Sequence, residues 1–409
     1  MNFNTLFDTV LQRASVSGVG VEGLKNFLVR LENPHTLFSV IHVAGTNGKG
    51  SVSTLLAGAL TAAGYKTGLF VSPHLTDPAE RIQINGKNIS KQAFSQALER
   101  VLQTEKEPLN FFEILTAAAF VCFANAHVKY VVLETGLGGR KDPTNVCLPV
   151  CSIITSIGKD HTQYLGNTLS QIATEKAGII KRAIPVFCGD VKPAALRVIR
   201  QTATRLQAPL TVVKEGDFFV TQAYKWRKNN TMLKDISKRT WKLHILGEKQ
   251  GQNACLVYRV CKQLGIADTC IRKAFATVSL PGRFEIKKVK NTIWIFDGAH
   301  NPQAVENLVS LWKKTPFYPN GVLVCAFMRD KDYKKMLKLL SPHFAQIIVT
   351  QIPSKRSAMA EEIKATCPFL KNVCYEKNCR RALERAAKFS CAVCSGSFYW
   401  VGLARQKLV

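Results

Sequence analysis

The segment Gly45-Thr46-Asn47-Gly48-Lys49-Gly50-Ser51 decides how the first half of the chain folds. An apolar run over residues 38–44 precedes it, and a helical pattern of apolar residues over 52–60 follows it. The order is therefore strand, loop and helix. In such a loop the backbone N–H groups and the positive end of the helix bind phosphate, and Lys49 adds a mobile positive charge. The spacing differs from the usual G-x-x-x-x-G-K-[ST], because Gly50 separates Lys49 from Ser51, whose hydroxyl can face a magnesium ion. A glycine-rich turn without a ligand is the weaker alternative.

Short apolar runs alternate with helical stretches in the following part of the chain. These runs cover residues 67–72, 130–134 and 151–157. The alternation predicts an α/β fold in which helices cover a mainly parallel sheet. Residues 211–245 differ, because their short alternating pieces indicate antiparallel ribbons at the edge of this domain.

A second domain is predicted after Leu280-Pro281-Gly282-Arg283, where the pattern breaks. New apolar runs at residues 292–296, 321–327 and 346–350 indicate a smaller, doubly wound domain. We therefore predict a P-loop-type ATPase domain with a mainly parallel sheet over residues 1–285. A smaller Rossmann-like α/β domain is expected over residues 291–409.

The composition is that of a globular protein with a large positive charge. Among 409 residues, 56 lysines and arginines outnumber 28 aspartates and glutamates, which gives a formal charge of +28. This charge attracts anions, such as a phosphate-rich or polyanionic small substrate. Clusters that mix bases with an aromatic residue, such as residues 225–228, also occur in nucleic-acid sites. A general lysine bias on solvated faces explains them better, so we expect no nucleic-acid partner.

Neither a membrane span nor a signal peptide is expected. The longest apolar stretch, residues 114–126, is too short to cross a bilayer, and residues 1–18 contain no apolar h-region. We therefore expect a cytoplasmic protein whose thirteen scattered cysteines are reduced. Cys391 and Cys394 form a lone C-x-x-C without a second pair at zinc-binding spacing, which disfavours a zinc or redox role.

Three polar side chains follow predicted strands and form a candidate metal set. Ser72 closes the apolar run 67–72, Glu134 closes the run 130–134, and His161 follows the run 151–157 after a short loop. Because the carboxyl ends of parallel strands meet at one edge of a sheet, the three side chains are expected to gather there. Magnesium prefers oxygen ligands and keeps several waters, so few protein groups are required. For any one of these residues alone, a surface or capping role is the simpler interpretation.

Seven motifs, taken in order, resemble the folylpolyglutamate synthase/dihydrofolate synthase family of the Mur ligase superfamily. They are Ala44-Gly45-Thr46-Asn47-Gly48-Lys49-Gly50-Ser51, Ser72-Pro73-His74-Leu75, Leu133-Glu134 with Gly136-Leu137-Gly138-Gly139-Arg140, Asp160-His161-Thr162, Glu175-Lys176-Ala177-Gly178, Leu280-Pro281-Gly282-Arg283-Phe284 and Asp297-Gly298-Ala299-His300-Asn301-Pro302. The Mur ligases of peptidoglycan synthesis share the loop but usually carry a nucleotide-sugar-binding domain ahead of it. The 44 residues before Gly45 are too few for such a domain.

The resemblance implies roles for the nucleotide and metal residues. ATP is expected to be bound by Gly48, Lys49, Gly50, Ser51, Asn253, Arg283 and Asp297. Magnesium is expected on Ser72, Glu134 and His161, and the resemblance leaves room for a potassium ion. Lys176 corresponds to the lysine that this family carries as a carbamate, which would add a fourth metal ligand. Lys49, Lys176 and His161 are the expected catalytic residues.

The resemblance also implies the substrates and the reaction. The pterin or folate pocket is expected to use Gly18, Val19, Phe112, Glu113, Lys141 and Asp142. A monomer would use ATP to activate the carboxylate of dihydropteroate, or the γ-carboxyl of a folate, as an acyl phosphate, and would then join it to the amine of L-glutamate. Two alternatives stay open at this point: a Mur-type or other amino-acid ligase, and a nucleotide-binding switch or nucleic-acid-dependent ATPase.

Overall fold

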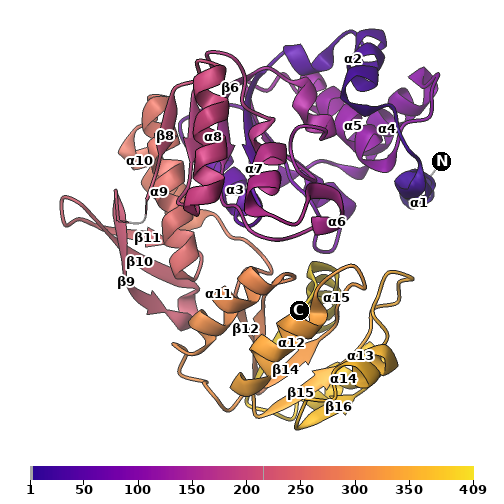
Figure 1. Ribbon diagram of the computed structural model, residues 1–409, viewed down its shortest axis with the longest axis vertical. Helices are drawn as coiled ribbons and strands as arrows, with labels where there is room; N and C mark the ends of the chain where they lie inside the picture. Colours follow the sequence, from indigo (N-terminus) through magenta and orange to yellow (C-terminus); the bar gives the residue numbers. More distant parts are fainter. Residues whose placement is uncertain (1–2, 215) are drawn as a thin grey trace. The chain divides into compact units, whose positions relative to one another are not determined.

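The strand ahead of the glycine-rich loop lies inside a parallel sheet in the computed structural model, which describes residues 3–214 and 216–409 (Figure 1). Within these residues the first sheet has eight strands in the order β4-β3-β2-β5-β1-β6-β7-β8. The neighbouring pairs from β2 to β8 in this order are parallel, whereas β3 pairs antiparallel with both β2 and β4. The bounds are β1 (Ser39–Ala44), β2 (Thr67–Phe70), β3 (Ile82–Ile84), β4 (Lys87–Asn88), β5 (Tyr130–Glu134), β6 (Pro149–Ile154), β7 (Val186–Cys188) and β8 (Leu210–Val212).

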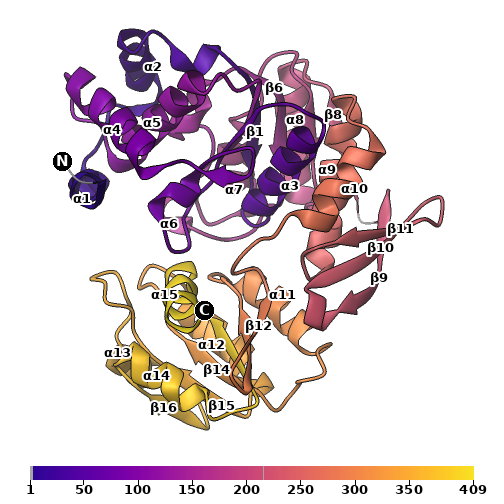
Figure 2. The same ribbon diagram turned by 180° about the vertical axis from the view of Figure 1, so that it is seen from behind.

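Helices cover both faces of this sheet because the side chains of a strand alternate between its faces. Val131 and Leu133 of β5 belong to a core that includes α5, and the intervening Val132 is left for the opposite face, where α3 contacts β5. Helices α3 and α10 pack side by side (Figure 2), and α7 packs on α8. The bounds are α1 (Phe3–Leu11), α2 (Gly20–Arg30), α3 (Lys49–Ala62), α4 (Lys91–Thr104), α5 (Phe111–Asn125), α6 (Thr162–Leu165), α7 (Leu169–Ala177), α8 (Pro193–Arg205), α9 (Glu248–Gln263) and α10 (Asp268–Thr277).

Helix α5 confirms the buried helix that was predicted from its apolar sequence. All residues from Glu113 to Phe123 are buried. The helix approaches the sheet closely at Gly68 of β2, where an added Cβ would lie 2.7 Å from the ring of Phe123. The capping box of Asn110 and Glu113 sets where α5 begins.

The second group of strands forms a separate six-stranded sheet in the described part of the chain, with the order β12-β13-β17-β14-β15-β16. Strand β12 is antiparallel to β13, and the other pairs are parallel. The α/β class with a mainly parallel sheet in each part is therefore confirmed. The bounds are β12 (Glu285–Val289), β13 (Thr292–Phe296), α11 (Pro302–Trp312), β14 (Val322–Cys325), α12 (Tyr333–Leu340), β15 (Gln346–Val349), α13 (Ala360–Thr366), β16 (Val373–Tyr375), α14 (Cys379–Ala386), β17 (Cys391–Ser395) and α15 (Phe398–Leu408).

One predicted strand ends earlier in the structure, and the predicted ribbons are present. The apolar run 151–157 leaves the sheet after Ile154, where its register with β1 and β7 ends. The Thr155 N–H still donates to Ala44 O of β1, and the hydroxyls of Thr155 and Ser156 donate to Asn47 O of the glycine-rich loop. The expected antiparallel ribbons are present as β9 (Phe219–Lys225), β10 (Asn230–Asp235) and β11 (Thr240–Leu243).

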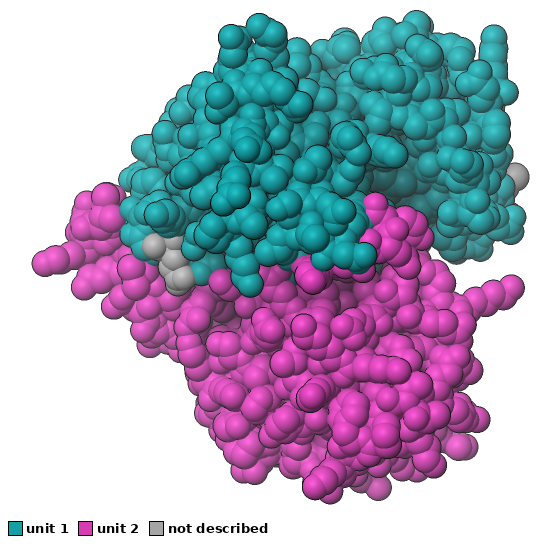
Figure 3. All heavy atoms as spheres, in the orientation of Figure 1, with its two compact units in different colours: residues 1–158, 165–219, 252–278 teal, residues 159–164, 220–251, 279–409 magenta. Residues whose placement is uncertain are grey.

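The chain divides into two compact units that each use several segments (Figure 3). The first unit contains residues 1–158, 165–219 and 252–278, and the second contains 159–164, 220–251 and 279–409. Most of the ribbon is thus grouped with the second unit, although the sequence analysis assigned it to the first domain. Periodicity cannot show which sheet a ribbon packs against. The division of the chain into residues 1–285 and 291–409 stays a prediction.

The cysteines of the described residues are free thiols, and most are buried. Burial raises the pKa of Cys391 in β17 to about 12, which opposes the thiolate that a redox or zinc site needs. No helix in the described ranges has both the length and the hydropathy needed to span a bilayer.

Candidate functional site

The glycine-rich loop has a backbone geometry that side chains would disturb. Helix α3 begins at Lys49, and Gly48 precedes it with a φ of 89°, in the left-handed region. A Cβ at Gly48 would lie 2.8 Å from Oδ1 of Asn253. The structure thus brings Asn253, which was predicted to bind nucleotide, next to the N-terminus of α3, the helix that follows the predicted phosphate-binding loop. Gly50 and the buried Ser51 lie in the first turn of that helix.

Residues 155–158 hold the loop in place. The Thr46 N–H donates to Ser156 O at 2.8 Å, and the Thr46 hydroxyl bonds both Gly158 O and Gly158 N–H. The Thr155 hydroxyl donates to Asn47 O at 2.8 Å. The sequence analysis missed Thr155 and Ser156, although two hydroxyl residues directly after a predicted strand were a usable signal. Their bonds fix the backbone at Thr46 and Asn47, so the start of the loop is ordered ahead of the N-terminus of α3, where a phosphate can bind.

Two lysines meet at one carbonyl of this loop. The Lys49 ammonium donates to Gly45 O at 3.1 Å, and the Lys176 ammonium donates to the same oxygen at 2.7 Å. Lys176 lies at the end of α7 and is only 3% exposed. Two cations that share one acceptor repel each other, so this part of the site favours an anion.

Glu134 lies beside these lysines at the end of β5. Its Oε1 is 4.0 Å from the Lys49 ammonium, and its Oε2 accepts the Ser72 N–H at 3.1 Å. The structure therefore brings together four predicted residues of the first unit: Lys49, Ser72, Glu134 and Lys176. The serine and carboxylate oxygens suit magnesium. In the described ranges, no three histidine, cysteine, aspartate or glutamate side chains gather at metal-binding spacing. A magnesium ion here would therefore rely on mixed oxygen ligands and water.

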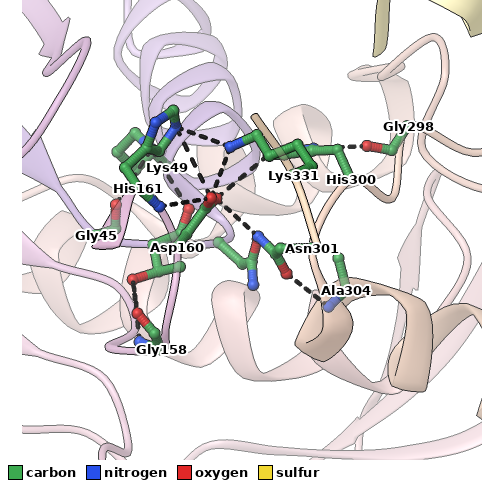
Figure 4. A network of polar contacts seen from close by, with 12 residues as sticks. Gly45, Lys49, Gly158, Asp160, His161, Gly298, His300, Asn301, Ala304 and Lys331 are labelled. Atoms are coloured by element: carbon green, nitrogen blue, oxygen red, sulfur yellow. Dashed lines mark hydrogen bonds and ion pairs between the residues drawn. The ribbon is translucent and has the colours of Figure 1, made fainter. Parts of the chain in front are cut away.

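His161 belongs to the second unit and lies in a polar network around Asp160 (Figure 4). Oδ1 of Asp160 accepts the Lys331 ammonium at 2.6 Å and the His161 N–H at 2.9 Å, while Oδ2 accepts the Asn301 amide at 3.0 Å. Burial raises the pKa of Asp160. At the low pH where Asp160 titrates, His300 is protonated, and its charge and that of Lys331 outweigh burial, so the pKa of Asp160 lies below its usual range.

Lys331 also donates to Nε2 of His161 at 3.0 Å. One ring nitrogen of His161, a predicted metal ligand, therefore accepts a hydrogen bond from an ammonium group. Burial lowers the pKa of His300 to about 4, so that ring is neutral at pH 7 and Lys331 supplies the positive charge beside Asp160. Neither Lys331 nor Asp160 was singled out as a site residue from sequence.

Arg283 and Asp297, predicted to bind nucleotide, both lie in the second unit. Asp297 follows β13, and its two oxygens accept the N–H groups of Ala299 at 2.9 Å and Phe284 at 3.0 Å. Burial raises the pKa of Asp297 to about 6, against the opposing charge of Arg283. The Arg283 guanidinium lies 4.8 Å from the centre of the Phe398 ring.

The predicted pterin residues form one corner of the first unit. Glu113 accepts the N–H groups of Val19 at 3.2 Å and Gly20 at 2.8 Å, so it orders the segment that begins at Gly18. A Cβ at Gly18 would lie 2.3 Å from Oε2 of Glu113, and one at Gly136 would lie 2.5 Å from the ring of Phe112. Glu113 thus acts on backbone, and Phe112 packs on the segment that follows Glu134.

Asp142 organises the same corner from the other side. Its Oδ2 accepts the Leu137 N–H at 2.7 Å, and its Oδ1 accepts both the N–H and the hydroxyl of Thr144. Burial raises the pKa of Asp142, while these hydrogen bonds lower it. The neighbouring Lys141 is exposed.

Comparison with known proteins gives this arrangement a family. The Mur ligase middle domain matches residues 43–261, and the Mur ligase glutamate ligase domain matches residues 282–397. The dihydrofolate synthase/folylpolyglutamate synthase of Bacillus subtilis is 34% identical over 365 residues, which are 84% of each chain. This chain belongs to the folylpolyglutamate synthase/dihydrofolate synthase family. It is therefore an ATP-dependent amide ligase of the Mur ligase superfamily, and neither a nucleotide-binding switch nor a nucleic-acid-dependent ATPase is favoured.

Solved structures of this ligase family have the same fold. A Mycobacterium tuberculosis folylpolyglutamate synthase complexed with ADP and AMPPCP has a TM-score of 0.88 at 29% identity and covers 99% of each chain. A bifunctional folylpolyglutamate synthase/dihydrofolate synthase from Yersinia pestis, complexed with AMPPNP and a Mn ion, has a TM-score of 0.86 at 26% identity. The match covers 100% of this chain and 98% of that one.

Gly48→Ala tests the contact between the glycine-rich loop and Asn253. The substitution should lower ATP affinity by about tenfold or more, because the methyl group meets the Asn253 amide, and it should cost about 1–2 kcal/mol of stability for its left-handed φ. Gly64→Ala is the matched control, since Gly64 has the same φ of 89° but no atom within 4 Å of an added Cβ. Titration calorimetry with a non-hydrolysable ATP analogue and urea unfolding measure both effects. Equal loss of ATP affinity in the two variants would contradict the role of the contact.

Asp297→Asn tests the ionisation of Asp297 through stability. Because the folded pKa of about 6 lies above the unfolded value, the wild-type carboxyl favours folding below about pH 4, and this contribution is lost as the pH rises through 6. Relative to the variant, the wild-type protein should therefore lose about 3 kcal/mol of unfolding free energy between pH 4 and pH 7. Urea unfolding across this range measures the difference, with exposed Asp8→Asn as the control. A constant difference would show that the pKa is not raised.

Proposed function

We propose that this chain uses ATP to join L-glutamate to the carboxylate of dihydropteroate, to the γ-carboxyl of a folate, or to both. The observation that carries the proposal is the meeting of Lys49, Lys176 and Glu134 at a rigid glycine loop. Family membership supports the acceptor class, because the B. subtilis relative is named for both activities. A muramyl-peptide acceptor is the weaker alternative.

The reaction needs activation because a carboxylate is a poor acylating agent in water. A carboxylate oxygen of the acceptor attacks the γ-phosphorus of ATP, the bond to the bridging oxygen breaks, and ADP leaves. The amine of glutamate then attacks the acyl phosphate, loses a proton, and expels inorganic phosphate to leave an amide. Lys49 would neutralise charge on the transferred phosphoryl group, which is the main source of catalysis in such transfers.

Ser72, Glu134 and His161 are the residues that would hold magnesium. The metal would neutralise the phosphate oxygens during transfer. The protein itself holds Glu134 in place for this role. The carboxylate accepts the Ser72 N–H, and the burial of Glu134 restricts its rotation. For His161 to bind the metal through Nε2, Lys331 has to release that nitrogen, and Asp160 provides an alternative acceptor for Lys331.

A carbamate on Lys176 would relieve the repulsion at Gly45. A neutral lysine amine that adds carbon dioxide and loses a proton carries a carboxylate but keeps one N–H. That N–H can still donate to Gly45 O, where the ammonium now lies at 2.7 Å. The new negative charge would attract Lys49 instead of repelling it and would add oxygen ligands for a metal.

The other predicted residues keep their proposed roles. We propose that Gly48, Gly50, Ser51, Asn253, Arg283 and Asp297 bind ATP, and that Gly18, Val19, Phe112, Glu113, Lys141 and Asp142 form the pterin pocket. The potassium ion, the monomeric state, the cytoplasmic location and the lack of a nucleic-acid partner stay predictions.

Product analysis tests the function directly. Purified chain is supplied with ATP, magnesium, labelled glutamate and one acceptor at a time: dihydropteroate, tetrahydrofolate or a muramyl peptide. Labelled amide and ADP are expected with at least one pterin acid and not with the muramyl peptide. ADP release that responds to DNA or RNA and ignores pterin plus glutamate would overturn the proposal.

Lys49→Ala should lower kcat about 100- to 1,000-fold, because the growing phosphoryl charge loses its counter-charge. Exposed Lys129→Ala is the control for loss of one positive charge and should keep normal turnover. Steady-state kinetics with the best pterin acceptor, with circular dichroism to verify folding, measure the effect. Near-normal turnover of Lys49→Ala would remove this lysine from the phosphate chemistry.

Lys176 should carry a carbamate that is detectable without turnover. Wild-type protein equilibrated with carbon-13 bicarbonate should show a carbamate carbon signal in its NMR spectrum, and Lys129→Ala should keep it. Lys176→Ala should lack the signal and lose most activity. A wild-type spectrum without the signal, or a signal that survives in Lys176→Ala, would refute the modification.

A further inference from the structure

A histidine lies completely buried in the middle of β1, three residues before Gly45. His42 is 0% exposed, and burial, together with the charge of Lys181, lowers its pKa to about 3. Its ring is therefore neutral at pH 7. A neutral histidine on a core strand often only fills space, so the hydrogen bonds decide whether it does more.

The ring belongs to a directed chain of hydrogen bonds that ends on Asp142. His42 Nε2 lies 2.8 Å from the Thr144 hydroxyl oxygen, and that hydroxyl donates to Oδ1 of Asp142 at 2.5 Å. A hydroxyl has one proton, which it uses toward the carboxylate, so it accepts from His42. The proton of the neutral ring is thus on Nε2. The other nitrogen, Nδ1, has no hydrogen-bond partner among the described residues.

Both carboxylate oxygens of Asp142 accept hydrogen bonds. Its oxygens accept the N–H groups of Leu137 and Thr144 and the Thr144 hydroxyl. These donors stabilise the charged form of a carboxylate that is only 3% exposed. The His42 bond polarises the Thr144 hydroxyl toward Asp142 and prevents its rotation, since a buried hydroxyl with two partners has one low-energy orientation.

We propose that His42 is a positioning residue for the pterin acceptor: through the Thr144 hydroxyl it sets the place of Asp142 and of the segment from Gly136 to Asp142. The proposal rests on the proposed function and extends it to a residue outside the pocket. Its physical basis is that β1 also carries the phosphate loop. One strand therefore sets the position of both the acceptor side and the phosphate side, and small errors in such alignment are costly in rate.

Four single variants test the chain of bonds. His42→Leu and Thr144→Val remove one donor each. Both should raise KM for the pterin acid about tenfold, because this is the usual effect of one lost buried hydrogen bond. The KM for ATP should change less than about twofold in both variants. His42→Gln and Thr144→Ser keep a donor at the same place and should restore most of the loss. A purely structural role would shift both KM values or neither.

The double variant His42→Leu/Thr144→Val decides whether the two residues act in series. If they do, the double variant should be no worse for the pterin KM than the worse single variant. Multiplied effects, or an unchanged pterin KM in His42→Leu, would overturn the proposal. If His42→Leu does not fold, Thr144→Val and Thr144→Ser test the other end of the same hydrogen bond, and an unchanged pterin KM in Thr144→Val overturns the proposal.

The wild-type assay separates the two claims. A wild-type chain that ignores every pterin acid would refute the proposed function, and this proposal with it. A wild-type chain that uses a pterin acid while His42→Leu and Thr144→Val match it in KM would refute only the role of His42.

Discussion

The Gly45 carbonyl oxygen, which accepts hydrogen bonds from the ammonium groups of Lys49 and Lys176, is the point on which the site depends. It brings two positive charges to the end of β1, close to the N-terminus of α3. Such an arrangement is costly without an anion, and a nucleotide phosphate supplies one. The hydrogen bonds that the hydroxyls of Thr155 and Ser156 donate to Asn47 O stabilise the loop, so the charge is held in place before any ligand arrives.

Buried carboxylates order backbone segments within each of the two units. Glu113 orders the segment at Val19 and Gly20, Asp142 orders the segment at Leu137, and Asp160 holds Lys331. Each of these carboxylates accepts at least one backbone N–H as well as any side-chain donors. A buried charge is tolerated only when such donors surround it, so these acids stabilise loop conformations at the edges of the sheets.

Much of the site could be predicted because parallel strands end at one edge. Ser72 and Glu134 were placed together on that argument, and the structure joins them by one hydrogen bond. The interpretation of His161 was less complete, since its ring nitrogen accepts from Lys331, which lies 170 residues away in sequence. No spacing rule connects residues so far apart. The ribbon was expected from its alternation, but its grouping with the second unit depends on packing that alternation does not encode.

The sequence alone determined the α/β class and the strand-loop-helix around Lys49, because these depend on local spacing, and its motifs gave the family resemblance that implies the acid-amine ligase chemistry. The tertiary structure decided which distant residues meet: Lys176 and His42 find their hydrogen-bond partners Gly45 and Thr144, and the Asn253 side chain lies against Gly48. These contacts join distant segments through the strand order of the first sheet, in which β1 lies between β5 and β6. Such an order results from packing the whole chain, and so the partners of buried polar groups become known only when the fold is complete.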